Sequence, residues 1–190
     1  MDKIKQQSMK VTQIAIGRFH HFHLARQLER HGLLNAIYTG YPRFKLKDEK
    51  GIPAEKIKTF PWIQAPFMAR GRFGLRRWDW LNKEWAWISH VSIDRYVAGQ
   101  IRENSIVVAL SGSGLLAGRM AQKMGGRHVC DRGSSHIRFQ DGILKEEYAK
   151  WKLPFKGIDE RVIAREEAEY QQADRITVPS EFVRKSFIGL

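Results

Sequence analysis

Cysteine is nearly absent: Cys130 is the only one among 190 residues. A lone cysteine cannot form a disulfide within the chain, so a disulfide-stapled domain is excluded and a reducing, cytoplasmic compartment is expected. No run approaches the ~18 consecutive apolar residues of a membrane-spanning helix, and the polar start, residues 1–10, lacks the apolar core of a secretory signal. Repeats and low-complexity segments are also missing. We therefore expect a soluble or peripheral globular protein.

Acidic residues are scarce relative to basic ones. The chain has 33 Lys and Arg against 20 Asp and Glu, a net charge of +13, while 43% of residues are hydrophobic. Residues 1–140 carry 24 basic and 10 acidic groups, and residues 141–190 carry 9 and 10. A basic front half favours an anionic partner, which could be nucleic acid, anionic lipid or a phosphorylated substrate.

Apolar β-branched runs alternate with helical patterns along the whole chain. The expected strands are 11–16, 33–39, 105–110, 127–130 and 175–179, with a short one near 57. The expected helices are 22–32, about 80–101, 114–126, one that ends near 173, and one capped by Ser180. The proline-rich stretch 40–66 is expected to be mostly loop. This order predicts an α/β fold, a Rossmann-like parallel sheet with helices on both faces, which binds ligands at the carboxyl ends of its strands.

A dense polar loop, "CDRGSSH", follows the strand at 127–130. Asp131 and His136 can share a proton or orient a hydroxyl, and Arg132 can hold a phosphate. The alternative is a capped turn, in which Ser134 or Ser135 starts a helix. A Ser-His hydrolase is disfavoured because no G-x-S-x-G motif is present.

The first strand is followed by "GRFHHFHLAR". Gly17 permits close approach of a ligand, and the helix start behind it favours anions. His20, His21 and His23 suggest a metal, but no cysteine or acid stands at a known ligand spacing, so no metal site is expected. A plain polar helix start is the alternative.

The loop "SGSGLLAG" matches a dinucleotide-binding fingerprint. Gly112 and Gly114 follow a strand, and Asp131 lies near the spacing of a ribose-binding acid. An NAD(P)-dependent oxidoreductase is therefore one alternative function. The other interpretation is a small-residue turn that packs a helix closely on the sheet.

The segment "REEAEYQQADRITVPSEFV" places Glu166 and Glu169 on one helix face, which we expect to be solvated. Together with "DRGSSH", it resembles the N-terminal domain of GT-B fold glycosyltransferases of family 4. The matching motif residues are Glu169, Tyr170, Ala173, Asp174, Pro179 and Ser180. The likeness covers nearly the whole chain, is strongest at 129–187 and is weak at 40–100.

The resemblance implies transfer of a sugar, with retention, from a nucleotide-sugar to a saccharide or lipid-linked acceptor, without a catalytic metal or a cofactor. Polysaccharide or glycolipid biosynthesis is the implied setting. His136 and Asp131 would approach the transferred sugar, while Gly17 and Arg18 would reach the donor phosphates. The acceptor would be bound by His20, His21, Arg132, Ser134, Ser135 and Ser111.

One departure from the family pattern is large, because its nucleotide-binding C-terminal domain is missing. The chain stops at "SFIGL", where the interdomain linker would begin. We therefore expect residues 1–190 to be a single acceptor-side domain, a fragment that is inactive alone.

Two further partners follow from the segment 67–88, in which aromatic and basic residues interleave. A basic nucleic-acid-binding domain is one alternative, but no recognised motif supports it, so no nucleic acid is expected. The other partner is an anionic membrane, with the protein peripheral on the inner face, although the tryptophans could instead pack into the core. The residues concerned are Phe67, Phe73, Trp78, Trp80, Trp85, Trp87, Arg70, Arg72, Arg76, Arg77 and Lys83.

Overall fold

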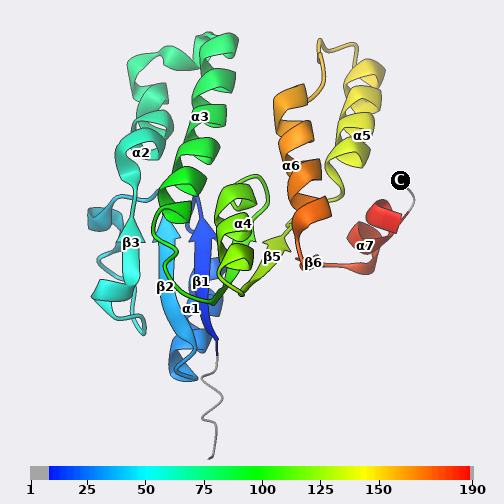
Figure 1. The fold of residues 1–190 in the computed structure, drawn as a ribbon. Coiled ribbons are helices and arrows are strands. Elements are labelled where there is room, and N and C mark those ends of the chain that lie inside the picture. The colour runs from blue at the N-terminus through cyan, green and yellow to red at the C-terminus, as the bar shows by residue number, and fades with distance from the viewer. Residues whose placement is uncertain (1–8, 189–190) are drawn as a thin grey trace, which may run out of the picture.

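A computed structural model describes residues 9–188 as a six-stranded sheet flanked by helices (Figure 1). Residues 1–8 and 189–190 lie outside the description, as do the side chains of Phe73 and Arg76. The strands are β1 (Lys10–Ala15), β2 (Leu34–Thr39), β3 (Ile57–Thr59), β4 (Ser105–Leu110), β5 (Arg127–Asp131) and β6 (Arg175–Thr177). The α-helices are α1 (His21–Arg30), α2 (Pro61–Ala69), α3 (Asp79–Ala98), α4 (Leu115–Lys123), α5 (Ile137–Lys150), α6 (Glu160–Gln172) and α7 (Glu181–Ile188). Among the described residues, no helix is long and apolar enough to cross a membrane.

The sheet has the order β3-β2-β1-β4-β5-β6, and every neighbouring pair is parallel. In the central pairings, Ile14 of β1 lies beside Tyr38 of β2 and Ala109 of β4. The chain runs outward in both directions from β1 and β4, so a crevice is expected where their C-terminal loops diverge. The predicted Rossmann-like α/β fold is confirmed.

Helices cover the sheet because successive side chains of a strand point to opposite faces. α3 and α4 pack on one face, where Val97 and Ala121 meet the strand residues Ile14 and Val107. α1 packs on the other side, with Phe22 against β2 and β3. Cys130 of β5 is fully buried in a third cluster with residues of α5 and α6.

Several helix boundaries follow from local chemistry. Gly32 has a φ of 65° just after α1, the left-handed position that ends many helices. Ser180 Oγ accepts the Val183 N–H at 3.3 Å and caps α7, as predicted. The helix α2 was not expected, since its sequence contains two prolines. Pro61 stands at its first position, where no N–H is needed.

One carboxylate reinforces the pairing of the last strand, β6, with β5. Asp174 accepts hydrogen bonds from the His128 N–H at 2.8 Å, from Gln122 Nε2 at 2.9 Å and from Arg127 Nη1 at 2.7 Å. These donors, with the backbone bond from His128 first, hold the pKa of Asp174 well below its ordinary value. The ionised carboxylate therefore joins α4, β5 and the start of β6.

We predict that Asp174→Ala lowers the free energy of unfolding by about 2 kcal/mol, because the His128 N–H loses its acceptor. Since the folded pKa is depressed, the native advantage is present above about pH 4 and is lost as the pH falls further. Denaturant unfolding at pH 7 and at lower pH measures both effects. The matched control is Asp79→Ala, whose side chain is 84% exposed and should matter little. Equal effects of the two substitutions would contradict the assignment.

Candidate functional site

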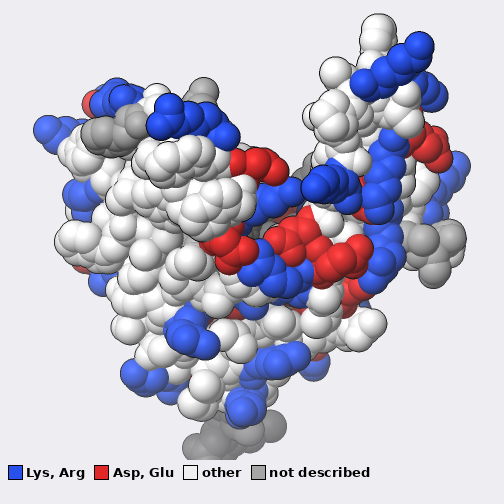
Figure 2. Space-filling model, turned by 90° about the horizontal axis from the view of Figure 1, so that it is seen from above, with Lys and Arg blue, Asp and Glu red and all other residues white. Residues whose placement is uncertain are grey.

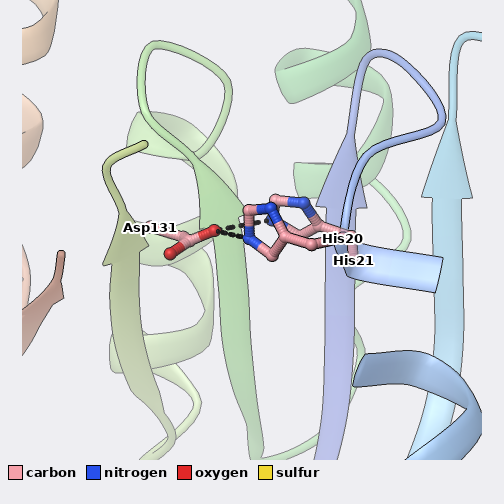
Figure 3. A group of neighbouring side chains, drawn as sticks. All are labelled: His20, His21 and Asp131. Carbon is pink, nitrogen blue, oxygen red and sulfur yellow. Dashed lines mark hydrogen bonds and ion pairs between the residues drawn. The ribbon is translucent and has the colours of Figure 1, made fainter. Parts of the chain in front are cut away.

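Three side chains from two distant parts of the chain meet where the strands of the sheet end (Figure 3). His20 and His21 lie where α1 begins after β1, and Asp131 ends β5. His20 Nε2 is 2.6 Å from Asp131 Oδ2, and His21 Nε2 is 3.3 Å from the same oxygen. The Thr177 hydroxyl donates to Asp131 Oδ1 at 2.7 Å and fixes the carboxylate from the other side.

The two histidines differ in their surroundings. The side chain of His21 is fully buried, and neither of its ring nitrogens has a hydrogen-bond partner. Burial lowers the pKa of His21 to about 4, while Asp131 opposes this shift and His20 adds to it. His20 stacks on His21 with ring centroids 4.5 Å apart, and its side chain is 59% exposed. His20 is thus the imidazole that a ligand can reach, and Asp131 orients it.

The same three residues form a group that could hold a metal ion, with ligand atoms within 4.8 Å of one another. Two ligands of a tetrahedral ion with bonds of about 2.0–2.1 Å stand about 3.3 Å apart. The 2.6 Å contact between His20 and Asp131 is instead a hydrogen-bond distance, so an ion would have to push these groups apart. The arrangement as it stands is that of an imidazole–carboxylate pair. Sequence spacing missed it because the acid lies 111 residues from His20.

Arg132 of the polar loop is buried and is engaged by the protein itself. Its Nη1 donates to Ser111 Oγ at 3.0 Å and to Glu166 Oε2 at 2.6 Å. Its Nε donates to the Ser135 carbonyl at 3.0 Å, and its Nη2 to Gln140 Oε1 at 2.7 Å. The charge of Arg132 is therefore balanced inside the fold, and with Ser111 it shapes the loop.

Ser134 and His136 of this loop both contact the first turn of α5. Ser134 Oγ donates to Gln140 Oε1 at 3.2 Å. His136, rather than a serine, caps α5, because its Nδ1 accepts the Arg138 N–H at 3.3 Å. Its ring centroid lies 5.1 Å from that of Tyr170 and 4.9 Å from that of Phe187. Burial is the main cause that lowers the pKa of His136. The structure brings Asp131 to His20 and His21, and records no contact between Asp131 and His136.

The loop after β1 lies beside the His20–Asp131 pair. A Cβ at Gly17 would stand 2.8 Å from the Phe19 ring, so this glycine allows the ring to fold back over the backbone. The Arg18 guanidinium pairs with Glu49, which also binds Arg26 Nη1 at 2.8 Å. Arg18 remains half exposed at this edge.

The glycine-rich loop after β4 is filled by the protein's own carboxylates. Glu169 Oε2 accepts the Gly112 N–H at 2.7 Å. Asp94 accepts the N–H groups of Leu116 and Ala117 at 2.8 to 3.1 Å, and these lie at the start of α4. A dinucleotide would place its pyrophosphate at this helix start. Asp94 already takes that place.

The two glutamates of α6 correct one expectation. Glu166 and Glu169 share a helix face, but that face is buried and not solvated. Gly114 is needed for the same close packing, because a Cβ there would lie 2.3 Å from Ala109 Cβ and 2.7 Å from Glu169 Oε1. The glycine pattern is thus explained by helix–sheet packing.

We predict that Gly114→Ala destabilises the fold by about 3 kcal/mol, since a Cβ there overlaps two rigid neighbours. Thermal or denaturant unfolding measures the loss. Gly133→Ala is the control, because nothing lies within 4 Å of a Cβ at that position. A Gly114→Ala protein as stable as the Gly133→Ala protein would refute the packing role.

A cavity of about 240 Å³ opens between α3 and α6, next to the glycine-rich loop. Figure 2 looks onto this side of the molecule and shows basic and acidic side chains around a hollow. The Trp87 ring lies 5.3 Å from the Arg161 guanidinium and 6.0 Å from that of Arg165. His90 Nδ1 is 3.2 Å from Ser113 Oγ. The lining residues include Lys83, Trp87, His90, Asp159, Arg165 and Glu166.

Sequence reasoning missed this cavity because its walls come from helices and not from loops that follow strands. The tryptophan-rich helix gave a signal, but it did not show which face of the helix Trp87 and His90 would occupy. Burial lowers the pKa of His90 to about 4, and the nearby Arg165 adds to this shift. His90 is therefore neutral at pH 7.

We predict that this neutral histidine makes stability depend on pH. The unfolded chain binds the proton below about pH 6.5, whereas the folded chain resists it down to about pH 4. The free energy of unfolding should therefore fall through this range as the pH falls, by about 1.4 kcal/mol per unit from this group. His90→Gln should make the slope shallower by that amount in denaturant titrations. An unchanged slope would show that His90 titrates normally in the fold.

No family model matches the chain, and no curated protein or solved structure shows significant similarity to it. The motif that suggests glycosyltransferases has a physical explanation within this fold. Glu169 holds the Gly112 loop, the Tyr170 hydroxyl donates to Glu166, and Asp174 ties β6 to β5. These motif residues therefore hold α6 and β6 in place against the rest of the fold.

Proposed function

We propose that this chain is the acceptor-binding domain of a retaining glycosyltransferase, which transfers a sugar from a nucleotide-sugar to a saccharide or lipid-linked acceptor. Support comes from the sequence resemblance together with the crevice side of the sheet. An accessible imidazole–carboxylate pair and a cavity with an aromatic wall both lie there. The cavity is the observation that carries the proposal.

The cavity has the chemistry that a saccharide requires. The Trp87 ring gives the cavity an aromatic wall against which a pyranose ring can pack, while charged groups around it can bind hydroxyls. Lys83, whose side chain is 45% exposed, supplies a donor, and Asp159 supplies acceptors. A site lined with one aromatic plane and groups of both signs suits a polyhydroxylated neutral ligand better than a polyanion.

The pair at the sheet edge would serve the transferred sugar. Asp131 holds His20 in a fixed tautomer, so that the exposed part of its ring can donate to or accept from a sugar hydroxyl. The buried, neutral His21 forms the wall behind it. Gly17 and Arg18 lie on the same loop and would face the donor phosphates, with most of the nucleotide held by a second domain. We propose no metal in the reaction and no cofactor besides the donor.

The contacts at the start of α4 disfavour an NAD(P)-dependent oxidoreductase. A pyrophosphate at the start of α4 would meet the carboxylates of Asp94 and Glu169, which already accept those N–H groups. The expected result is no measurable binding of NAD(H) by calorimetry. Micromolar binding would favour the oxidoreductase over the transferase.

The proposal is tested in a protein that joins this domain to a nucleotide-sugar-binding domain. Asp131→Asn should lower the turnover of sugar transfer by about 10²-fold, the scale of a positioned acid–base or polar group, with the same melting temperature. Trp87→Ala should instead raise the KM for the acceptor. Asp79→Asn is the control, and EDTA should change nothing. Wild-type turnover in the Asp131→Asn protein would remove the pair from the reaction.

A further inference from the structure

Two tips of the molecule project on the side where the strands end (Figure 1). Tip one, residues 70–80, joins α2 to α3 and contains two short 3-10 turns. Tip two, residues 148–156, joins the end of α5 to the approach of α6. The cavity between α3 and α6 lies between the helices that carry the tips. The tips therefore flank the entrance to the proposed acceptor site.

Tip one exposes tryptophan beside arginine. Trp80 is 67% exposed and Trp78 is 43% exposed. The Arg77 guanidinium stands 5.3 Å from the Trp78 ring centroid. Within residues 70–80 the sequence has four arginines and one acid, Asp79, which pairs with Lys83. Of the sequence-predicted membrane residues, Phe67, Trp85 and Trp87 are only partly exposed.

Tip two was not predicted, and it has the same chemistry. Trp151 is 74% exposed and Leu153 is 57% exposed. The tip is internally braced, because the Tyr148 and Phe155 rings lie 4.6 Å apart and the Leu153 N–H donates to the Tyr148 carbonyl at 2.9 Å. Residues 148–156 contain three lysines and no acid. The bracing thus holds two exposed apolar side chains among basic residues at this tip.

We propose that the two tips together dock the domain on an anionic lipid bilayer. Tryptophan is favoured at the headgroup level of a membrane, and cations beside it are drawn to anionic headgroups. Arg72, Arg77 and Lys152 form no ion pair within the described part of the chain, so their charge is available to such a surface. Two separate contacts on one side also fix the orientation, with the cavity facing the bilayer.

A lipid surface fits these tips better than a single-stranded nucleic acid. Stacking of bases uses aromatic planes along one continuous basic groove. Here the exposed aromatic residues lie on two separate tips, and the aliphatic Leu153 at tip two offers no ring on which a base could stack. Insertion of side chains into the headgroup region uses the exposed apolar groups of both tips, Trp78, Trp80, Trp151 and Leu153.

The experiment is co-sedimentation of the chain with vesicles of phosphatidylcholine alone and of phosphatidylcholine with phosphatidylglycerol. We expect binding to the anionic vesicles at low salt and weaker binding as salt is added. The double substitution Trp80→Ala with Trp151→Ala should lower the partition coefficient by at least about tenfold, because both anchors are lost. The double substitution Arg77→Glu with Lys152→Glu should also weaken binding to the anionic vesicles. It should make the remaining binding less dependent on salt concentration.

The controls change similar residues away from the tips. Trp62→Ala removes a tryptophan that is 75% exposed at the first turn of α2, and it should bind as the wild type does. Lys123→Glu reverses an exposed charge at the end of α4, which leads into β5 at the opposite edge of the sheet. Circular dichroism confirms that all variants fold.

Three results would overturn the proposal: no binding to anionic vesicles at low salt, an equal loss of binding in the Trp62→Ala protein, or binding to a single-stranded oligonucleotide in place of vesicles. The proposal goes beyond the glycosyltransferase assignment and does not depend on sugar transfer. A protein that binds vesicles but transfers no sugar would leave the docking surface standing. A protein that transfers sugar but ignores vesicles would remove the docking surface alone.

Discussion

The packing of this domain depends on carboxylates buried at the start of α4. Asp94 of α3 and Glu169 of α6 accept N–H groups around one helix terminus, and Arg165 of α6 pairs with Asp94 and donates to the Gly112 carbonyl at 2.8 Å. Burial raises the pKa of Asp94, while the backbone donors and Arg165 oppose that shift. Removing one partner would leave a buried charge uncompensated, which typically costs about 3–5 kcal/mol. These contacts hold α3, α4 and α6 together against the central strands.

The same buried contacts also shape one wall of the cavity between α3 and α6. Arg165, Glu166 and Gly112 line the same space as Trp87. Because each of these groups is held by a second internal partner, the wall has little freedom to rearrange. A ligand would therefore meet a preformed surface, and less binding energy would be spent on ordering side chains.

The α/β fold could be predicted because its signals are local. Apolar runs bounded by glycine mark the strands, and their alternation with helices dictates a parallel sheet. The carboxyl ends of parallel strands lie at one edge of the sheet, so His20 and Asp131 could be placed at the same edge from the sequence. Their direct contact could not be predicted, because β4 lies between their strands. The burial of Glu166 and Glu169 could not be predicted because their partners, Arg132 and Gly112, lie on other segments. The helix α2 could not be predicted because it contains two prolines, and proline usually breaks a helix.

The distance in sequence between His20 and Asp131 has a consequence for how the site comes into being. They are 111 residues apart, and β4, which pairs with both β1 and β5, sets the distance between the two strands. Contacts between residues this far apart in sequence carry a cost of loop closure, which slows folding. The imidazole–carboxylate pair therefore exists only when all three strands are assembled.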